Sequence, residues 1–173
     1  MDSSLSQKPW WNYIEEDLRE LLKEAQLLIS KVETWEEKFH DYAFIVFPAA
    51  KAYEGFLKKL FLDLEFITEE DYFGKRFRVG KALNPSLEKE LREKESVYDK
   101  IVQFCQGPKL ADLLWETWKE GRNRLFHWFP NEKNALSLEE AKVRVGMIIE
   151  AMDAAFKECK IERSSNGRKA AAV

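Results

Sequence analysis

The sequence predicts an all-α fold: an antiparallel helical bundle of four to five main helices, with a long heptad helix at its N-terminal end. Apolar residues recur in steps of three and four along most of the chain, which is the period of an α-helix. No segment alternates apolar and polar residues as a half-buried strand does. With 7 Gly and 5 Pro among 173 residues, the chain also has few residues for the tight turns of a β-rich fold.

The charge of the chain limits the ways in which it can meet nucleic acid. It has 28 basic and 31 acidic residues, which gives a net charge of -3. Proteins that coat nucleic acid non-specifically usually have a basic face, so this class is not favoured. An enzyme that contacts RNA only at a local site is compatible with such a charge.

The sequence also carries expectations about location and cofactors. It has no run of about 18 apolar residues, so we expect no membrane-spanning helix. The N-terminal residues lack the pattern of a signal peptide, and we expect a cytoplasmic protein in which Cys105 and Cys159 are reduced core thiols. Two His and two Cys at these separations do not form a zinc pattern, so we expect no metal and no cofactor.

The heptad helix is expected over residues 12–39. Its apolar residues alternate in steps of four and three: Ile14, Leu18, Leu21, Ala25, Leu28, Val32, Trp35 and Phe39. One interpretation is a helix that lies across the domain, and the other is a seam for a second copy of the chain. We expect residues 1–40 to form this N-terminal helix, 41–160 a helical domain, and 161–173 a disordered tail.

Within residues 41–160 the period predicts helices over 44–64, 96–105 and 109–128, a last helix from 137 onward, and a short turn at 68–72. Pro48 is expected either in the first turn of the helix 44–64 or at a kink. Gly107 and Pro108 should end the helix 96–105. Ser137 and Glu140 have the spacing of a capping box at the start of the last helix.

Residues 74–95 have no clear period and are expected to form a loop with a short helical piece. The segment begins with a basic run in which Lys75, Arg76, Arg78 and Lys81 flank the aromatic Phe77. Such a run can follow an RNA backbone while the ring stacks on a base. The alternative is a solvated basic loop.

The helix 109–128 contains the polar residues most indicative of chemistry. At about 100° per residue, its core face would hold Leu110, Leu114, Trp118 and Leu125. Asn123 and His127 would lie together on nearly the opposite side, with Arg122 at the flank. Because Arg binds phosphate through a planar fork and His titrates near neutral pH, the trio could hold a phosphodiester and move protons around it. The alternative is an exposed polar patch without a function.

The motif resembles that of the HEPN superfamily, whose members are small all-α nucleases often found as toxins and in antiviral systems. Arg122, Asn123 and His127 match its pattern of Arg, a polar residue, three further residues and His, and the likeness covers roughly residues 41–160. Within the superfamily, the chain is most similar to the HEPN domain of the RNase LS toxin. In a proline-containing helix of that group, a basic residue and a glutamate three positions later join the active site. Lys51 and Glu54 have this spacing here.

The resemblance implies a metal-independent endoribonuclease, in which the ribose 2′-OH attacks the adjacent phosphorus and leaves a 2′,3′-cyclic phosphate and a 5′-OH. His127 would act as general base or acid, and Arg122 would stabilise the transition state. Asn123 would bind a phosphate oxygen or orient His127. Glu54 would pair with Arg122 or tune the histidine.

Five basic residues are candidates for contacts with the RNA: Lys51, Lys75, Arg76, Arg78 and Arg124. For Arg124 a surface salt bridge is the alternative. HEPN domains dimerise so that two motifs meet in one cleft, which implies a homodimer with a composite active site and, for a toxin, a protein antitoxin as a further partner. Two other functions are compatible with the sequence: a non-catalytic HEPN module that binds RNA or a protein, and a helical antitoxin or adaptor that uses the heptad helix as its seam.

Overall fold

The computed structural model of the chain describes residues 5–128, 130 and 134–159. In this part of the chain the regular structure is entirely helical, which confirms the all-α class and the bundle architecture. The tail predicted over residues 161–173 lies outside the described residues.

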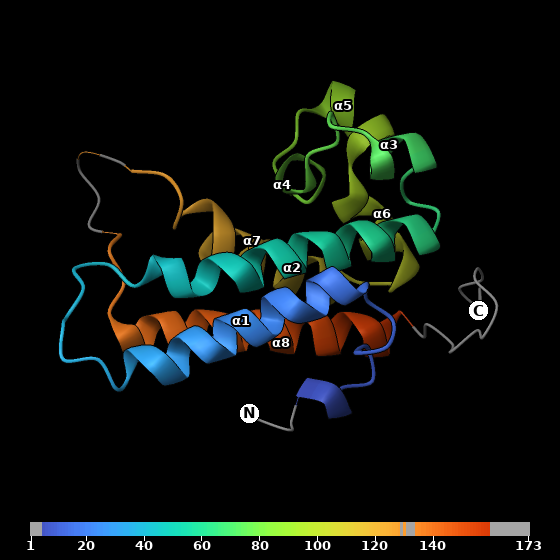
Figure 1. The fold of residues 1–173 in the computed structure, drawn as a ribbon. Helices are drawn as coiled ribbons and strands as arrows, with labels where there is room; N and C mark the ends of the chain where they lie inside the picture. The colour runs from blue at the N-terminus through green and yellow to red at the C-terminus, as the bar shows by residue number, and fades with distance from the viewer. Residues whose placement is uncertain (1–4, 129, 131–133, 160–173) are drawn as a thin grey trace.

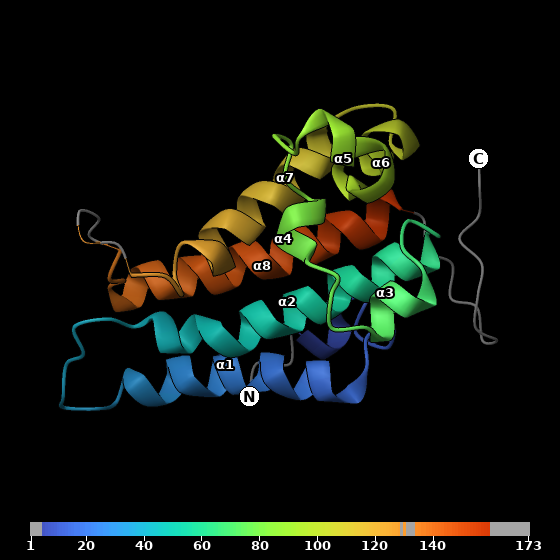
Figure 2. The same cartoon turned by 90° about the horizontal axis from the view of Figure 1, so that it is seen from above.

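Four helices make up most of the bundle: α1 (Glu16–Val32), α2 (Ala43–Asp63), α7 (Lys109–Trp118) and α8 (Leu138–Glu158). Smaller elements are the 3-10 turn η1 (Leu5–Gln7), the helices α3 (Glu69–Phe73), α4 (Val79–Ala82), α5 (Lys89–Glu95) and α6 (Val97–Phe104), and the π-helical turn η2 (Lys119–Asn123). Helix α1 runs antiparallel to α2, and α7 runs antiparallel to α8 (Figures 1 and 2). The short helices α3 to α6 gather toward one end of the bundle.

Helix α2 is the central element, because it packs against α1, α8 and η2. It is apolar on nearly all sides, the pattern of a helix that is buried rather than amphipathic. Tyr53, Phe56, Leu57 and Phe61 are completely buried. Pro48 lies inside α2, beyond its first turn, so the helix begins before the proline and loses one hydrogen bond there.

Helix α1 is shorter than the predicted heptad helix 12–39, and that prediction was wrong at both ends. The chain before it turns so that the buried indole of Trp10 can donate a hydrogen bond to Asp153 on α8, at 2.6 Å. At its C-terminal end, the hydroxyl of Thr34 donates to the carbonyl of Lys31, and the acidic Glu36 and Glu37 oppose the helix dipole.

The apolar face of α1 packs against other helices of the same chain. Leu18, Leu22, Ala25 and Val32 are buried in the same core as α2 and α8. The structure therefore favours the interpretation of a helix that lies across the domain. Leu21 and Leu28, which the heptad pattern also includes, are half-buried against this core.

The capping box predicted from the sequence is confirmed. Ser137 and Glu140 form the predicted capping box at the start of α8, and Thr68 forms a second box with Asp71 at the start of α3. Hydrogen bonds from Ser137 hold the pKa of Glu140 below its usual value. The segment 74–95 is partly helical, with α4 and α5 joined by a short loop.

The thiols of Cys105 and Cys159 are not joined in a disulfide. Burial raises the pKa of Cys159 to about 12 and also raises that of the half-buried Cys105. None of the described helices combines the length and the hydrophobicity that a membrane span needs.

Candidate functional site

The guanidinium of Arg122 lies where η2 meets α2. Its Nη2 is 3.9 Å from Oε2 of Glu54, and its Cζ is 5.2 Å from the centroid of the Trp118 ring. The side chains of Arg122 and Glu54 are 37% and 38% exposed, whereas Trp118 is 4% exposed. A cation that rests on a buried ring and faces one carboxylate keeps a fixed place at the surface.

The ring below Arg122 is itself held by the core. Trp118 packs against Tyr53 at a centroid distance of 6.5 Å, and the Tyr53 hydroxyl donates to the carbonyl of Leu114 at 3.1 Å. Burial raises the pKa of Tyr53, so this hydroxyl stays protonated in the folded protein. Trp118 was predicted to face the core, and this is confirmed.

The predicted pairing of Glu54 with Arg122 is present in the structure, although its length makes it a loose ion pair. Lys51 lies three residues earlier on α2 and is exposed. Residues three apart on a helix are neighbours on its surface, so Lys51 and Glu54 share one side of α2.

The first two residues of the motif, Arg122 and Asn123, stand in a π-helical turn and not in an α-helix. The N–H of Arg124 donates to the carbonyl of Lys119, five residues earlier, at 3.0 Å. Gly121 in the same turn is buried against α8, where a Cβ would lie 3.3 Å from Ile148. Single π turns are rare and occur often at functional sites.

The prediction that the fourth helix runs to residue 128 was wrong. Regular helix ends at Asn123, so Asn123 and His127 do not stack four residues apart on one helical face. Contacts made by two side chains, those of Phe126 and Asn134, explain the end. The ring of Phe126 packs on Phe47 of α2 at 5.5 Å, and the amide of Asn134 donates to the carbonyls of Arg124 and His127 at 3.0 and 2.6 Å.

Both Asn123 and His127 are exposed, in keeping with the prediction that neither faces the core. The contacts of Asn134 fix the backbone at His127, because they hold its carbonyl next to that of Arg124. The imidazole of His127 therefore belongs to a turn whose backbone is held by Asn134, and this turn follows Arg122 directly along the chain.

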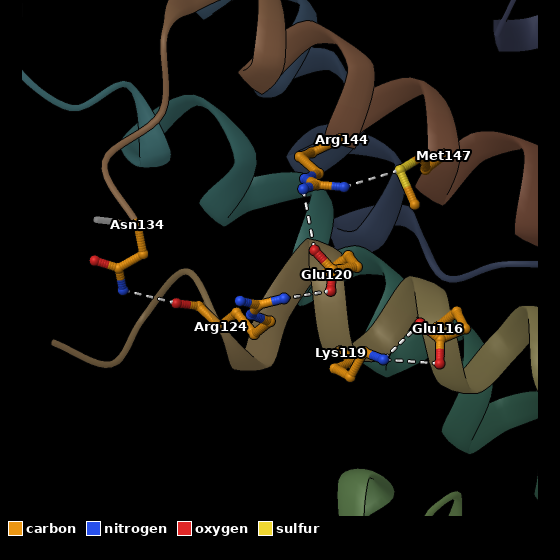
Figure 3. A network of polar contacts seen from close by, with 7 residues as sticks. All are labelled: Glu116, Lys119, Glu120, Arg124, Asn134, Arg144 and Met147. Atoms are coloured by element: carbon orange, nitrogen blue, oxygen red, sulfur yellow. Dashed lines mark hydrogen bonds and ion pairs between the residues drawn. The ribbon is translucent and has the colours of Figure 1, made fainter. Parts of the chain in front are cut away.

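A polar network lies beside the motif and joins η2 to α8 (Figure 3). Glu120 accepts from Arg124 at 3.1 Å and pairs with Arg144 at 3.0 Å. The side chain of Glu120 is only 20% exposed. Arg124 therefore forms the surface salt bridge that was the alternative to a phosphate contact.

The basic segment lies between α3 and α4, where Lys75, Arg76 and Arg78 are all exposed. Arg76 and Arg78 line a cavity, and Arg78 donates to the backbone carbonyl of Lys75. The next helix touches the motif side of the bundle: a Cβ on Gly80 would overlap Nε1 of Trp118. Trp118 therefore lies against both Gly80, in the helix that follows the basic segment, and the guanidinium of Arg122.

Reasoning from the sequence missed two residues that shape this region and one role of a third. Glu120 could have been found, because it stands four residues before Arg124, a spacing that favours an ion pair on a helix. Asn134 carried no signal, since its partners belong to a turn that replaces a predicted helix. Trp118 was recognised as a core residue, but its second role as the support of Arg122 was not.

In the described part of the chain, no three His, Cys, Asp or Glu residues gather as metal ligands would. Comparisons of the chain with models of protein families, with curated proteins and with solved structures gave no match.

Proposed function

We propose that the protein is a metal-independent endoribonuclease of the HEPN type, acting as a toxin or antiviral defence component. The observation that carries this proposal is the position of Arg122. It is supported by the buried ring of Trp118, faces a single carboxylate on Glu54, and still exposes about a third of its side chain. A planar guanidinium held in this way suits a phosphodiester, which it can bind through two parallel hydrogen bonds.

In the proposed reaction, His127 accepts the proton of a ribose 2′-OH, and the 2′ oxygen forms a bond to the adjacent phosphorus. The bond from phosphorus to the 5′ oxygen then breaks, and that oxygen takes up a proton. The products are a 2′,3′-cyclic phosphate and a 5′-OH, so no water is consumed and no redox step occurs. A general base or acid in this position typically contributes about 10²–10⁴ in rate.

The other groups act on charge and position. Arg122 stabilises the negative charge that grows on the phosphoryl oxygens, while Asn123 on the same turn binds one of them. Glu54 holds the guanidinium in place until substrate arrives. Lys51, on the same side of α2 as Glu54, attracts the RNA strand.

The proposal includes a homodimer in which two copies of the motif share one cleft. The second copy supplies a second His127, which protonates the leaving 5′ oxygen while the first acts as base. Such an enzyme would require restraint in its own cell, and a protein antitoxin that covers Arg122 and His127 would provide it.

A second function is favoured by one observation, the end of regular helix at Asn123. Without a shared helical face, Asn123 and His127 are not arranged in advance for proton transfer. A module that binds RNA or a protein through Arg122 and its neighbours, without cutting, would need no such arrangement.

The test is cleavage of RNA by the purified protein in EDTA. The wild type is compared with His127→Ala and with His40→Ala, which removes the other histidine of the chain. The ribonuclease proposal predicts cutting that is abolished only by His127→Ala. Equal behaviour of the three proteins would refute it and leave the binding module.

A further inference from the structure

A cavity of about 340 Å³ lies between α3, α4 and α5, next to the basic segment. Its apolar lining includes the buried Ile67, Ala82 and Val97. A cavity of this size is within the range of small-molecule pockets. None of the residues of the Arg122 motif lines it.

The rim of the cavity carries more positive than negative charge. Four cationic side chains line it, from Arg76, Arg78, Lys81 and Lys94, against two carboxylates. This excess stands out in a chain whose net charge is -3. Two of the cations come from the loop before α4, one from α4 and one from α5, so two stretches of the chain, residues 76–81 and α5, converge on one opening.

Both carboxylates are already engaged. Asp71 accepts from the backbone N–H and the hydroxyl of Thr68 at 3.0 and 2.8 Å, where it completes a capping box. Glu95 pairs with Lys81 at 2.5 Å. The ion pairs of the described residues do not include Arg76 or Lys94, whose charges are therefore available to an anion.

Two aromatic side chains complete the lining. Phe66 and Phe77 are both half-buried, and Phe66 is fixed by an edge contact with Phe104 at 5.9 Å. A ring between two arginines in sequence offers a face for a planar base, because stacking on an aromatic ring does not depend on which base is present. Cationic groups beside a stacking surface match a phosphate joined to a base.

We propose that this cavity binds one nucleotide, with the phosphate against Arg76 and Lys94 and the base against Phe77. The nucleotide is either a free ligand or one residue of an RNA strand. The proposal does not depend on RNA cleavage by the Arg122 motif. Because Gly80 of α4 and Arg122 both lie against Trp118, a shift of α4 on nucleotide binding would reach the Arg122 motif through this one side chain.

The probes are adenosine 5′-monophosphate and a fluorescein-labelled oligoadenylate of eight residues. Binding is measured by calorimetry and by fluorescence anisotropy, with the His127→Ala protein so that no probe is consumed. The test variants are Arg76→Gln combined with Lys94→Gln, and separately Phe77→Ala. The matched control combines Lys31→Gln with Lys157→Gln, which removes two exposed lysines on α1 and α8. Circular dichroism confirms that each variant is folded.

Loss of a charged hydrogen bond or of a stacking contact should weaken binding roughly tenfold or more in each test variant, and not in the control. Weakened binding of the mononucleotide identifies a free nucleotide as the ligand. Weakened binding of the oligonucleotide alone identifies a residue of an RNA strand. If neither probe distinguishes the test variants from the control, the proposal is wrong, whatever the outcome of the cleavage assay.

Discussion

Arg122 of η2 faces Glu54 of α2, with 3.9 Å between Nη2 and Oε2. This distance is too long for a hydrogen bond of ordinary strength, so the carboxylate orients the guanidinium without occupying its donors. The stronger constraint on Arg122 is the ring of Trp118 beneath it, which lies in the core. The guanidinium of Arg122 therefore packs against the Trp118 ring, while 37% of the Arg122 side chain stays exposed.

The first prediction concerns the fork itself. Arg122→Lys keeps the charge but loses the planar pair of donors, so RNA cleavage should fall by roughly 10²-fold, the effect of removing one preorganised donor to a transition state. The measurement is the rate of RNA cleavage under single-turnover conditions. Arg19→Lys on α1 is the matched control, and a comparable loss in that variant would show that the effect is not specific to the motif.

The second prediction concerns the network in Figure 3. Glu120 joins Arg124 to Arg144, and its side chain is 20% exposed. Glu116 pairs with one cation among the described residues, Lys119, and is 52% exposed. Glu120→Gln should therefore lower the free energy of unfolding by about 1 kcal/mol, and Glu116→Gln by less than about 0.5 kcal/mol. Urea unfolding of both variants provides the comparison. Equal losses would mean that the network adds nothing beyond a surface pair.

The third prediction concerns the π turn. A Cβ at Gly121 would lie 3.3 Å from Ile148, so Gly121→Leu should push η2 away from α8 and cost about 1–3 kcal/mol of stability. A Cβ at Gly146 on α8 would meet no other part of the protein within 4 Å, and Gly146→Ala should stabilise the protein by about 0.5–1 kcal/mol.

Thermal unfolding of these two glycine variants should give shifts of opposite sign. A Gly121→Leu protein as stable as the wild type would show that the turn can move without loss, and would remove the structural basis for a fixed Arg122.

The fourth prediction concerns acid stability. Arg92 donates two hydrogen bonds to Asp99, at 2.9 and 2.7 Å, and these hold the pKa of Asp99 below its ordinary value of 3.8. In the unfolded chain this carboxyl gains a proton at a higher pH than in the folded protein. The pair therefore stabilises the fold above pH 3.8, and its contribution is lost as the pH falls below that value.

The stability difference between wild type and Asp99→Asn should accordingly be constant above about pH 5 and should shrink below about pH 4. Arg92→Gln breaks the same pair from the other side and should show the same dependence. Urea unfolding at a series of pH values tests both variants. A difference that grows as the pH falls would contradict the assignment.

The helices that could be predicted from the sequence are those with local signals. The capping box of Ser137 and the apolar period of α2 specify their elements without help from distant residues. The predicted 12–39 helix failed because its seam continued through Trp35 and Phe39, whose rings pack together outside the helix at 5.7 Å. A periodic pattern does not reveal where tertiary contacts replace helical ones.

The candidate site was predictable in part for the same reason. The pairing of Glu54 with Arg122 agrees with the spacing that suggested it. The π turn did not follow from the sequence, because it depends on the fit of Gly121 against α8 and on the donation from Asn134 to two carbonyls. The cavity beside α4 also depends on Lys94 of α5, which the fold brings to the same cavity as the basic run.

The most direct test of the ribonuclease account is the chemistry of the cut ends. RNA is incubated with the wild type and with His127→Ala in EDTA, and the termini of the products are determined. The account predicts 2′,3′-cyclic phosphate and 5′-OH ends with the wild type and no products above background with the variant. Products with 5′-phosphate ends, or identical products from both proteins, would contradict attack by the 2′-OH with His127 as the proton acceptor.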